Sequence, residues 1–178
     1  MTIRHLQEEA TLVIPGIPVS MTASTPITSE YINAAGCELV ECILFLAVSV
    51  AGATSVGRIE ILAATDASGT SAEAVPFKDL YKTIGATTIA DGTGIPTRIE
   101  QSVGTIPTAI EYYDTLAADG DKQQQFVIPI RTRSLPSGKN YVAIRFTAGS
   151  ATARNGLTAF IRRGNIYGST LHLSSIFA

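Results

Sequence analysis

Apolar residues recur along the chain in short blocks separated by turn-forming residues. In residues 57–65 and 141–147, apolar side chains occupy every second position, which is the period of a β-strand with one buried face. Residues 157–163 alternate in the same way. Between such blocks lie segments rich in Asp, Ser, Gly and Pro, such as residues 65–73 and 135–140, which are typical of tight turns. The pattern therefore predicts many short strands joined by turns.

One block differs because it is apolar almost throughout. Residues 37–50 read CELVECILFLAVSV, which predicts a strand covered on both faces or one long central strand of a sandwich. A buried helix is the rival interpretation of such a run. We favour the strand because Val, Ile, Phe and Cys predominate and because Gly36 and Gly52 bracket the block.

The remaining strands are predicted from weaker alternation. Short strands are expected at residues 30–33 and from Val75 onward, and further candidates lie within the less regular section 79–121. Residues 123–131 form another expected strand. Its Pro129 cannot donate to a strand ladder, so that part of the strand should lie at an edge or a bulge.

Together these elements predict an all-β protein, an antiparallel β-sandwich of jelly-roll type with extended N- and C-terminal arms. No stretch of ten or more residues has a convincing helical pattern. We expect an N-terminal arm at residues 1–18, a β-sandwich domain at 19–168 and a C-terminal tail at 169–178. A disordered terminus is the alternative for the arm, where Pro15 and Pro18 stop any helix.

Charge is scarce in this chain of 178 residues. Charged residues make up 16%, below the quarter typical of soluble domains, and hydrophobic residues make up 46%. Part of the surface is therefore either uncharged or covered by another protein chain. The net charge of −2 provides no general attraction for nucleic acid or anionic membranes. No apolar run reaches the ~20 residues of a membrane span, and the first residues lack the pattern of a secretory signal.

Residues suited to catalysis or metal binding are few and scattered. The only histidines are His5 and His172, and no metal-site, nucleophile or phosphate-loop motif accompanies them. Asp66 and the pair Asp119 and Asp121 lie in turns without a complete set of calcium ligands. We therefore predict no enzyme activity, no catalytic residue, no cofactor and no metal. Cys37 and Cys42 are expected to be reduced, small hydrophobic residues.

Two kinds of binding residue need weighing. The C-terminal half is relatively basic because it contains six arginines: Arg131, Arg133, Arg145, Arg154, Arg162 and Arg163. They indicate solvated sheet faces or intersubunit ion pairs rather than a nucleic-acid site. Exposed aromatic side chains could instead stack on sugars, which leaves a receptor- or glycan-binding sandwich as the alternative function. The candidates are Tyr112 with Tyr113, or Tyr141 with Tyr167, although the chain has no Trp.

Three segments occur in an order that resembles a known class of virion proteins. They are GCELVECILFLAVSVAGAT, RIEILAATDASGTS and KNYVAIRFTAGSATA, and the order is similar to small head-decorating (cement) proteins of tailed bacteriophages. In that class, a strand ending in an [Asp/Asn/Ser]-Gly turn and a Tyr-[Leu/Val]-x-[Ile/Val]-Arg strand recur, which here fall on residues 64–70 and 141–145. The resemblance covers roughly residues 36–163. Residues 79–122 fit it poorly, and residues 167–178 extend beyond the usual end.

The resemblance implies a non-enzymatic virion protein that decorates the outer capsid surface and cements it by bridging major capsid subunits. Such a protein is assembled in the host cytoplasm, partners the major capsid protein and forms a homo-oligomer, with a trimer as the natural symmetry. It binds neither nucleic acid nor membrane. Terminal segments could add to a neighbour's sheet edge. The interface residues expected on these grounds are Thr11, Leu12, Val13, Ile14, Leu171, Leu173, Ile176 and Phe177.

Overall fold

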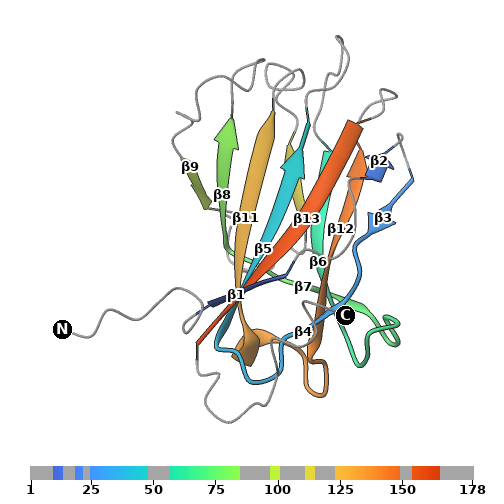
Figure 1. The fold of residues 1–178 in the computed structure, drawn as a ribbon, viewed down its shortest axis with the longest axis vertical. Coiled ribbons are helices and arrows are strands. Elements are labelled where there is room, and N and C mark those ends of the chain that lie inside the picture. The colour runs from blue at the N-terminus through green and yellow to red at the C-terminus, as the bar shows by residue number, and fades with distance from the viewer. Residues whose placement is uncertain are drawn as a thin grey trace, which may run out of the picture.

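The computed structural model describes residues 10–13, 19–21, 25–47, 57–84, 97–100, 111–114, 123–148 and 154–164. Within these ranges the regular structure is β-strand, apart from the single 3-10 turn η2 at Thr132–Ser134 (Figure 1). The strands form two antiparallel sheets whose inner side chains share one hydrophobic core. The predicted all-β sandwich is therefore confirmed. In the described part of the chain, no helix has the length and apolar character needed to cross a membrane.

Sheet A contains the strand predicted from the apolar block, now in its interior. The order of its strands is β1 (Ala10–Val13), β13 (Arg154–Arg163), β5 (Leu39–Leu46), β11 (Gln124–Arg131), β8 (Asp79–Ile84) and β9 (Thr97–Glu100). A further short strand, β2 (Val19–Met21), pairs with the other end of β13. Part of the expected N-terminal arm is thus an edge strand of the chain's own sheet.

Sheet B is built around two long strands. The order of its strands is β10 (Glu111–Asp114), β6 (Gly57–Ala64), β12 (Tyr141–Ala148) and β3 (Ile27–Thr28). In addition, β4 (Ile32–Asn33) pairs with β12, and β7 (Glu73–Val75) pairs with β6. All pairings within both sheets are antiparallel.

The pairing of strands follows a nested order along the chain. The innermost pair is β8 with β9, followed outward by β6 with β10, β5 with β11, and β4 with β12. These four pairs belong in turn to sheet A, sheet B, sheet A and sheet B. The chain therefore behaves as one long antiparallel ribbon that is folded over itself to make two layers.

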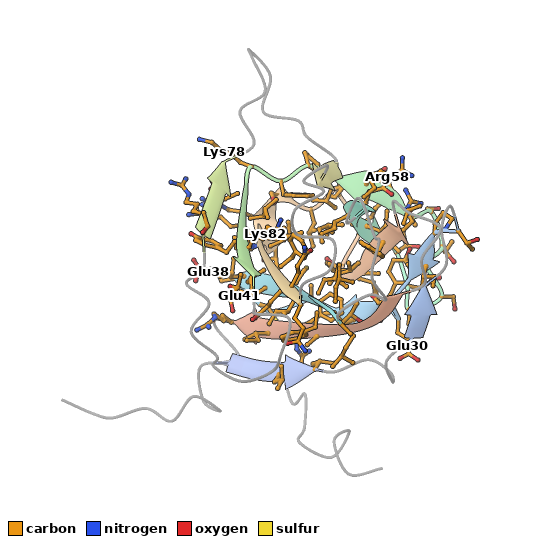
Figure 2. All side chains as sticks on the ribbon, turned by 90° about the horizontal axis from the view of Figure 1, so that it is seen from above. Glu30, Glu38, Glu41, Arg58, Lys78 and Lys82 are labelled. Carbon is orange, nitrogen blue, oxygen red and sulfur yellow. The ribbon has the colours of Figure 1, made fainter. Side chains whose placement is uncertain are left out.

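The core lies between the layers and follows the alternation expected from the sequence. From β5 it receives Val40, Cys42, Leu44 and Leu46, from β6 Ile59, Ile61 and Ala63, and from β12 Val142, Ile144 and Phe146. Phe126 and Phe160 fill the centre and are completely buried. Lys82 and Gln124 are polar exceptions among the buried inward residues, with exposures of 4% and 3%. The Lys82 ammonium lies 5.8 Å from the centre of the Phe126 ring (Figure 2).

Several sequence predictions need adjustment. The strand β8 was not foreseen, since its sequence DLYKTI mixes charged residues with apolar ones. Arg133 lies in the 3-10 turn and so does not share a strand face with Arg131. Pro129 lies in the interior strand β11, but pairing with β8 ends at Val127, so this stretch has a ladder partner only on the β5 side. Pro129 thus lies in an interior strand rather than in the predicted edge strand or bulge, and it is tolerated because no ladder partner stands opposite it on the β8 side.

Candidate docking face on sheet A

An ion pair lies on the outer face of sheet B and buries a carboxylate there. Arg145 donates hydrogen bonds of 2.8 and 2.7 Å to the two carboxylate oxygens of Glu60 on the neighbouring strand. The Glu60 side chain is only 5% exposed, and Arg58 Nε lies 3.4 Å from its Oε2 atom. This bidentate geometry satisfies a carboxylate that would otherwise be costly to bury.

The turn after β6 lies at the end of this face and contacts Tyr31. Asp66 Oδ1 accepts hydrogen bonds from the backbone N–H groups of Ser68 and Thr70, which fixes the turn and leaves Gly69 at a φ of +80°. The ring of Tyr31 lies directly against Gly69, so close that an added Cβ would be 2.6 Å from its Cε2 atom. Burial raises the pKa of Tyr31, and the nearby positive charge of Arg145 acts in the opposite direction.

The outer face of sheet A has a different character, which follows from the strand register. One row across the strands is Leu12, Ile161, Glu41 and Pro129; the next is Ala159, Ile43, Val127 and Tyr81; a third is Leu157, Phe45 and Gln125. We call these eleven residues the docking face. Nine of the eleven are apolar or aromatic, whereas an exposed sheet face normally carries polar residues. Polar side chains continue two of these rows toward the sheet edge, since Thr83 is the register partner of Gln125 and Arg98 that of Tyr81.

Exposure of these side chains is concentrated on the same face. Among the described residues, the large hydrophobic side chains that are exposed are Leu12 (55%), Phe45 (38%) and Tyr81 (38%), and all three belong to the docking face. Ile43, between them, is only 6% exposed. Of the two interpretations of the apolar block, coverage on both faces holds at Ile43 but not at Phe45, whereas a central strand of a sandwich agrees with the place of β5 between β13 and β11. Leu12, Phe45 and Tyr81 lie in three different rows, with the buried residues Ile43 and Ala159 between them, so the face presents separate exposed apolar side chains rather than one continuous patch. Their location on one face makes that face the candidate for binding another molecule.

The predicted interface residues divide into two groups. Leu12 lies on the docking face, Val13 faces inward and packs against the core, and Thr11 belongs to the same strand, β1. Sheet A ends at β1, so among the described strands the outer side of residues 10–13 has no partner. Ile14, Leu171, Leu173, Ile176 and Phe177 lie outside the described residues.

Sequence reasoning missed the part of the docking face that lies on the body of the sandwich. Phe45 belongs to the block predicted to be either a strand covered on both faces or one long central strand of a sandwich, and neither interpretation singles out Phe45 as exposed. Tyr81 belongs to β8, which the sequence did not predict. The sequence does contain a sign of this face. In the block LVECILFL, the odd-numbered residues Ile43 and Phe45 are apolar, although a strand with one buried face would have polar residues at these positions.

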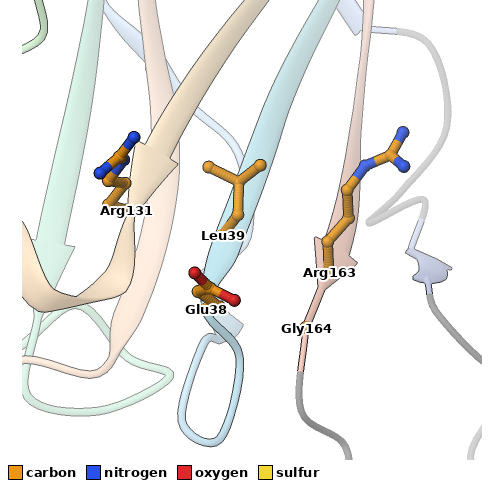
Figure 3. A pocket seen from close by; sticks show the side chains of 5 residues that line it. All are labelled: Glu38, Leu39, Arg131, Arg163 and Gly164. Carbon is orange, nitrogen blue, oxygen red and sulfur yellow. The ribbon is translucent and has the colours of Figure 1, made fainter.

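A cleft adjoins the docking face at the end of sheet A. Its lining residues are Glu38, Leu39, Arg131, Arg163 and Gly164, and its volume is about 300 Å³ (Figure 3). Arg131, Leu39 and Arg163 are direct register partners on three adjacent strands. Arg163 forms an ion pair with Glu41, with 3.1 Å between Nε and Oε1.

Potential metal ligands in the described part of the chain do not form a cluster. No set of three or more His, Cys, Asp or Glu side chains there could hold a metal ion. Asp66 uses its carboxylate to fix a turn, and His5, His172, Asp119 and Asp121 lie outside the described residues. Both cysteines are free, with Cys42 buried and Cys37 partly buried.

Comparison with known proteins finds no family model that matches the chain, and no curated protein that matches it. Its function is therefore inferred from the fold and from the docking face.

Proposed function

We propose that this chain is a non-enzymatic virion structural protein that decorates a phage capsid and stabilises it by bridging major capsid subunits. The observation that carries this proposal is the docking face, where every exposed large hydrophobic side chain of the described residues is found. Burying apolar surface contributes about 25 cal/mol per Å², so a face of this kind binds by area and shape without chemistry. The natural location is the outer capsid surface, after assembly in the host cytoplasm.

We further propose that the sandwich is of jelly-roll type. A jelly roll is an eight-stranded double sheet made from two Greek keys. The nested pairs β8–β9, β6–β10, β5–β11 and β4–β12, alternating between the sheets, support this topology. The additional strands β1, β2 and β13 extend sheet A on one side and thereby widen the docking face.

The open side of β1 supports a second contribution to binding. An unpaired strand edge can accept a strand from a neighbouring chain, which adds backbone hydrogen bonds to the apolar contact. We propose that residues 10–14 and the tail 169–178 supply such contacts, with the major capsid protein and with other copies in a homotrimer. Closed threefold symmetry matches the arrangement of subunits on a capsid.

The proposal is tested on purified phage heads that lack this protein. Wild-type protein should bind them saturably and should raise the temperature at which they come apart. Tyr81→Ser should weaken binding by about tenfold, because it removes apolar area from the docking face. Tyr141→Ser makes the same chemical change on the outer face of sheet B, so it should leave binding unchanged. Absence of wild-type binding, or equal effects of both variants, would contradict the proposal.

The alternative is a receptor- or glycan-binding sandwich of a head fibre or tail. One observation favours it, because Phe45 and Tyr81 are exposed aromatic rings on one face and could stack on sugar rings. Of the tyrosines expected for this role, Tyr141 is partly buried, Tyr167 lies outside the described residues, and Tyr112 and Tyr113 belong to β10 of sheet B. Saturable binding to a glycan array by a protein that ignores phage heads would establish this alternative.

A further inference from the structure

The cleft at the end of sheet A places two arginines on either side of a leucine. Arg131 on β11 and Arg163 on β13 are both register partners of Leu39 on β5, so their Cα atoms are on the order of 10 Å apart at the usual strand spacing. Their side chains rise on the two sides of Leu39, while Glu38 lies at the rim (Figure 3). The resulting cleft has an apolar floor between two cationic walls.

The backbone around the cleft is fixed. The N–H of Glu38 donates to the carbonyl of Arg163 at 2.9 Å, and the carbonyl of Glu38 accepts from the N–H of Thr132 at 3.0 Å. Gly164 has a φ of +97° and lies so close to Glu38 that an added Cβ would be 2.5 Å from the Glu38 Cβ. The backbone that carries the two arginines is therefore held in place, while their side chains remain to be ordered by a ligand.

The two arginines are not equivalent. Arg163 is already paired with Glu41, and this contact is close enough for an ion pair although Nε is not aligned for a hydrogen bond. The Arg131 guanidinium is exposed, and it has no ion-pair partner among the described residues. An exposed guanidinium presents a planar fork of N–H donors that matches the two oxygens of a carboxylate.

The cleft is continuous with the docking face. Leu39 and Glu41 project from the same side of β5, one step apart in its alternation, so the arginine row lies next to the row of Leu12 and Ile161. A molecule seated on the docking face would therefore cover the cleft as well. Glu38 and Glu41 offset much of the positive charge, which favours a single carboxylate over a polyphosphate or nucleic acid.

We propose that this cleft binds the carboxylate of an Asp or Glu side chain on the protein to which the docking face attaches. Arg131 holds the carboxylate through its fork, Arg163 supplies a second positive charge, and Leu39 contacts the stem of the incoming side chain. The inference rests on the proposed function, since the partner is a subunit of the capsid shell. It adds the chemical group that fixes the orientation of the protein on the shell.

The test measures binding of the full chain to phage heads lacking this protein, over a range of salt concentrations. Arg131→Glu should weaken binding by about tenfold to a hundredfold, because it opposes the carboxylate with a like charge. Arg131→Lys keeps the charge but loses the fork, so an intermediate loss is expected. Arg133→Glu is the matched control, because Arg133 is also exposed but does not line the cleft, and the substitution changes the net charge by the same amount. The affinity for phage heads should then change by less than about twofold.

Each outcome separates the cleft from the wider proposal. Greater loss in Arg131→Glu than in Arg133→Glu, shrinking as salt rises, supports the carboxylate site. Equal losses would show a general charge effect and overturn it. Saturable wild-type binding that neither Arg131 variant alters would overturn the cleft inference and leave the proposed function intact. Wild-type protein that does not bind heads would overturn both, and binding of Arg131-dependent glycans instead would assign the cleft to sugars.

Discussion

Glu60 and Arg145 face each other across β6 and β12, and the Glu60 carboxylate is the more deeply buried of the two groups. The side chain of Glu60 is 5% exposed, whereas that of Arg145 is 33% exposed. Loss of either partner therefore leaves the other in a different environment. An isolated carboxylate at Glu60 cannot hydrate, but an isolated guanidinium at Arg145 can turn toward water.

This asymmetry gives the first prediction. Arg145→Met should lower the free energy of unfolding by about 3 kcal/mol, because it strands a buried charge that Arg58 compensates only in part. Glu60→Gln should cost less. Urea denaturation followed by circular dichroism measures both values. A larger loss in Glu60→Gln than in Arg145→Met would contradict this account of the pair.

Two glycines with nearly the same backbone conformation allow the cost of a left-handed backbone to be measured separately from the cost of a steric clash. Gly69 and Gly138 have φ values of +80° and +77°, but an added Cβ meets Tyr31 only at Gly69, while Gly138 has open space. Gly138→Ala should cost about 1 kcal/mol from the left-handed conformation alone. Gly69→Ala should cost roughly 1–3 kcal/mol more, since the Tyr31 ring must move.

The same pair provides its own check. In a Tyr31→Ala background, the ring is gone, so Gly69→Ala should cost no more than Gly138→Ala does. The measurement is the change in unfolding free energy within each background. An excess cost at Gly69 that persists without Tyr31 would show that the turn itself, and not the ring, forbids the side chain.

The two cysteines should differ in their reaction with thiol reagents. Burial raises the pKa of both thiols; at Cys42 the shift is large, and at Cys37 the positive charge of Arg162 partly opposes it. Because the thiolate is the reactive form, the folded protein should show slow modification of Cys37 and none of Cys42. Alkylation followed by mass spectrometry checks this. Cys37→Ser should abolish labelling until the protein unfolds, and labelling of the folded variant would contradict the prediction.

Acid should weaken the turn that Asp66 holds. Hydrogen bonds from Thr70, and then from the backbone of Ser68 and Gly69, hold the pKa of Asp66 below its ordinary value. A lowered folded-state pKa means that the stabilisation is present above the ordinary value of about 3.9 and is lost as the pH falls through the folded-state pKa. The stability difference between wild type and Asp66→Asn should therefore shrink in acid. A difference that stays constant over the pH range would contradict this role.

Local sequence patterns predict where most strands lie along the chain, but they do not predict which strands pair in the sheets. Alternation in residues 57–65 and 141–147 places the correct side chains in the core, because burial on one face imposes a period of two. The position of β5 between β11 and β13 cannot be read locally, since it depends on residues far along the chain. β8 escaped prediction because its buried Lys82 breaks the apolar pattern.

The candidate site was predicted only at its margin. Leu12 is expected at an interface because it lies in an apolar segment of the arm; the structure shows it exposed on the outer face of sheet A, and its role at an interface stays a prediction. The cleft required the strand register, since Arg131, Leu39 and Arg163 come from three separate segments and meet only when β5 is paired on both sides. Contacts of this kind arise from topology, which composition and spacing do not reveal.

The nested order of strand pairing also determines when sheet A can form during synthesis of the chain. Strand β5 leaves the ribosome early, but both of its partners, β11 and β13, belong to the last third of the chain. The unpaired N–H and C=O groups along its two edges and its apolar side chains must therefore wait for these partners. Such distant pairings fold slowly, on the order of milliseconds to seconds. During that interval, other nascent copies of the chain present competing partners, so efficient production should depend on low temperature or chaperones.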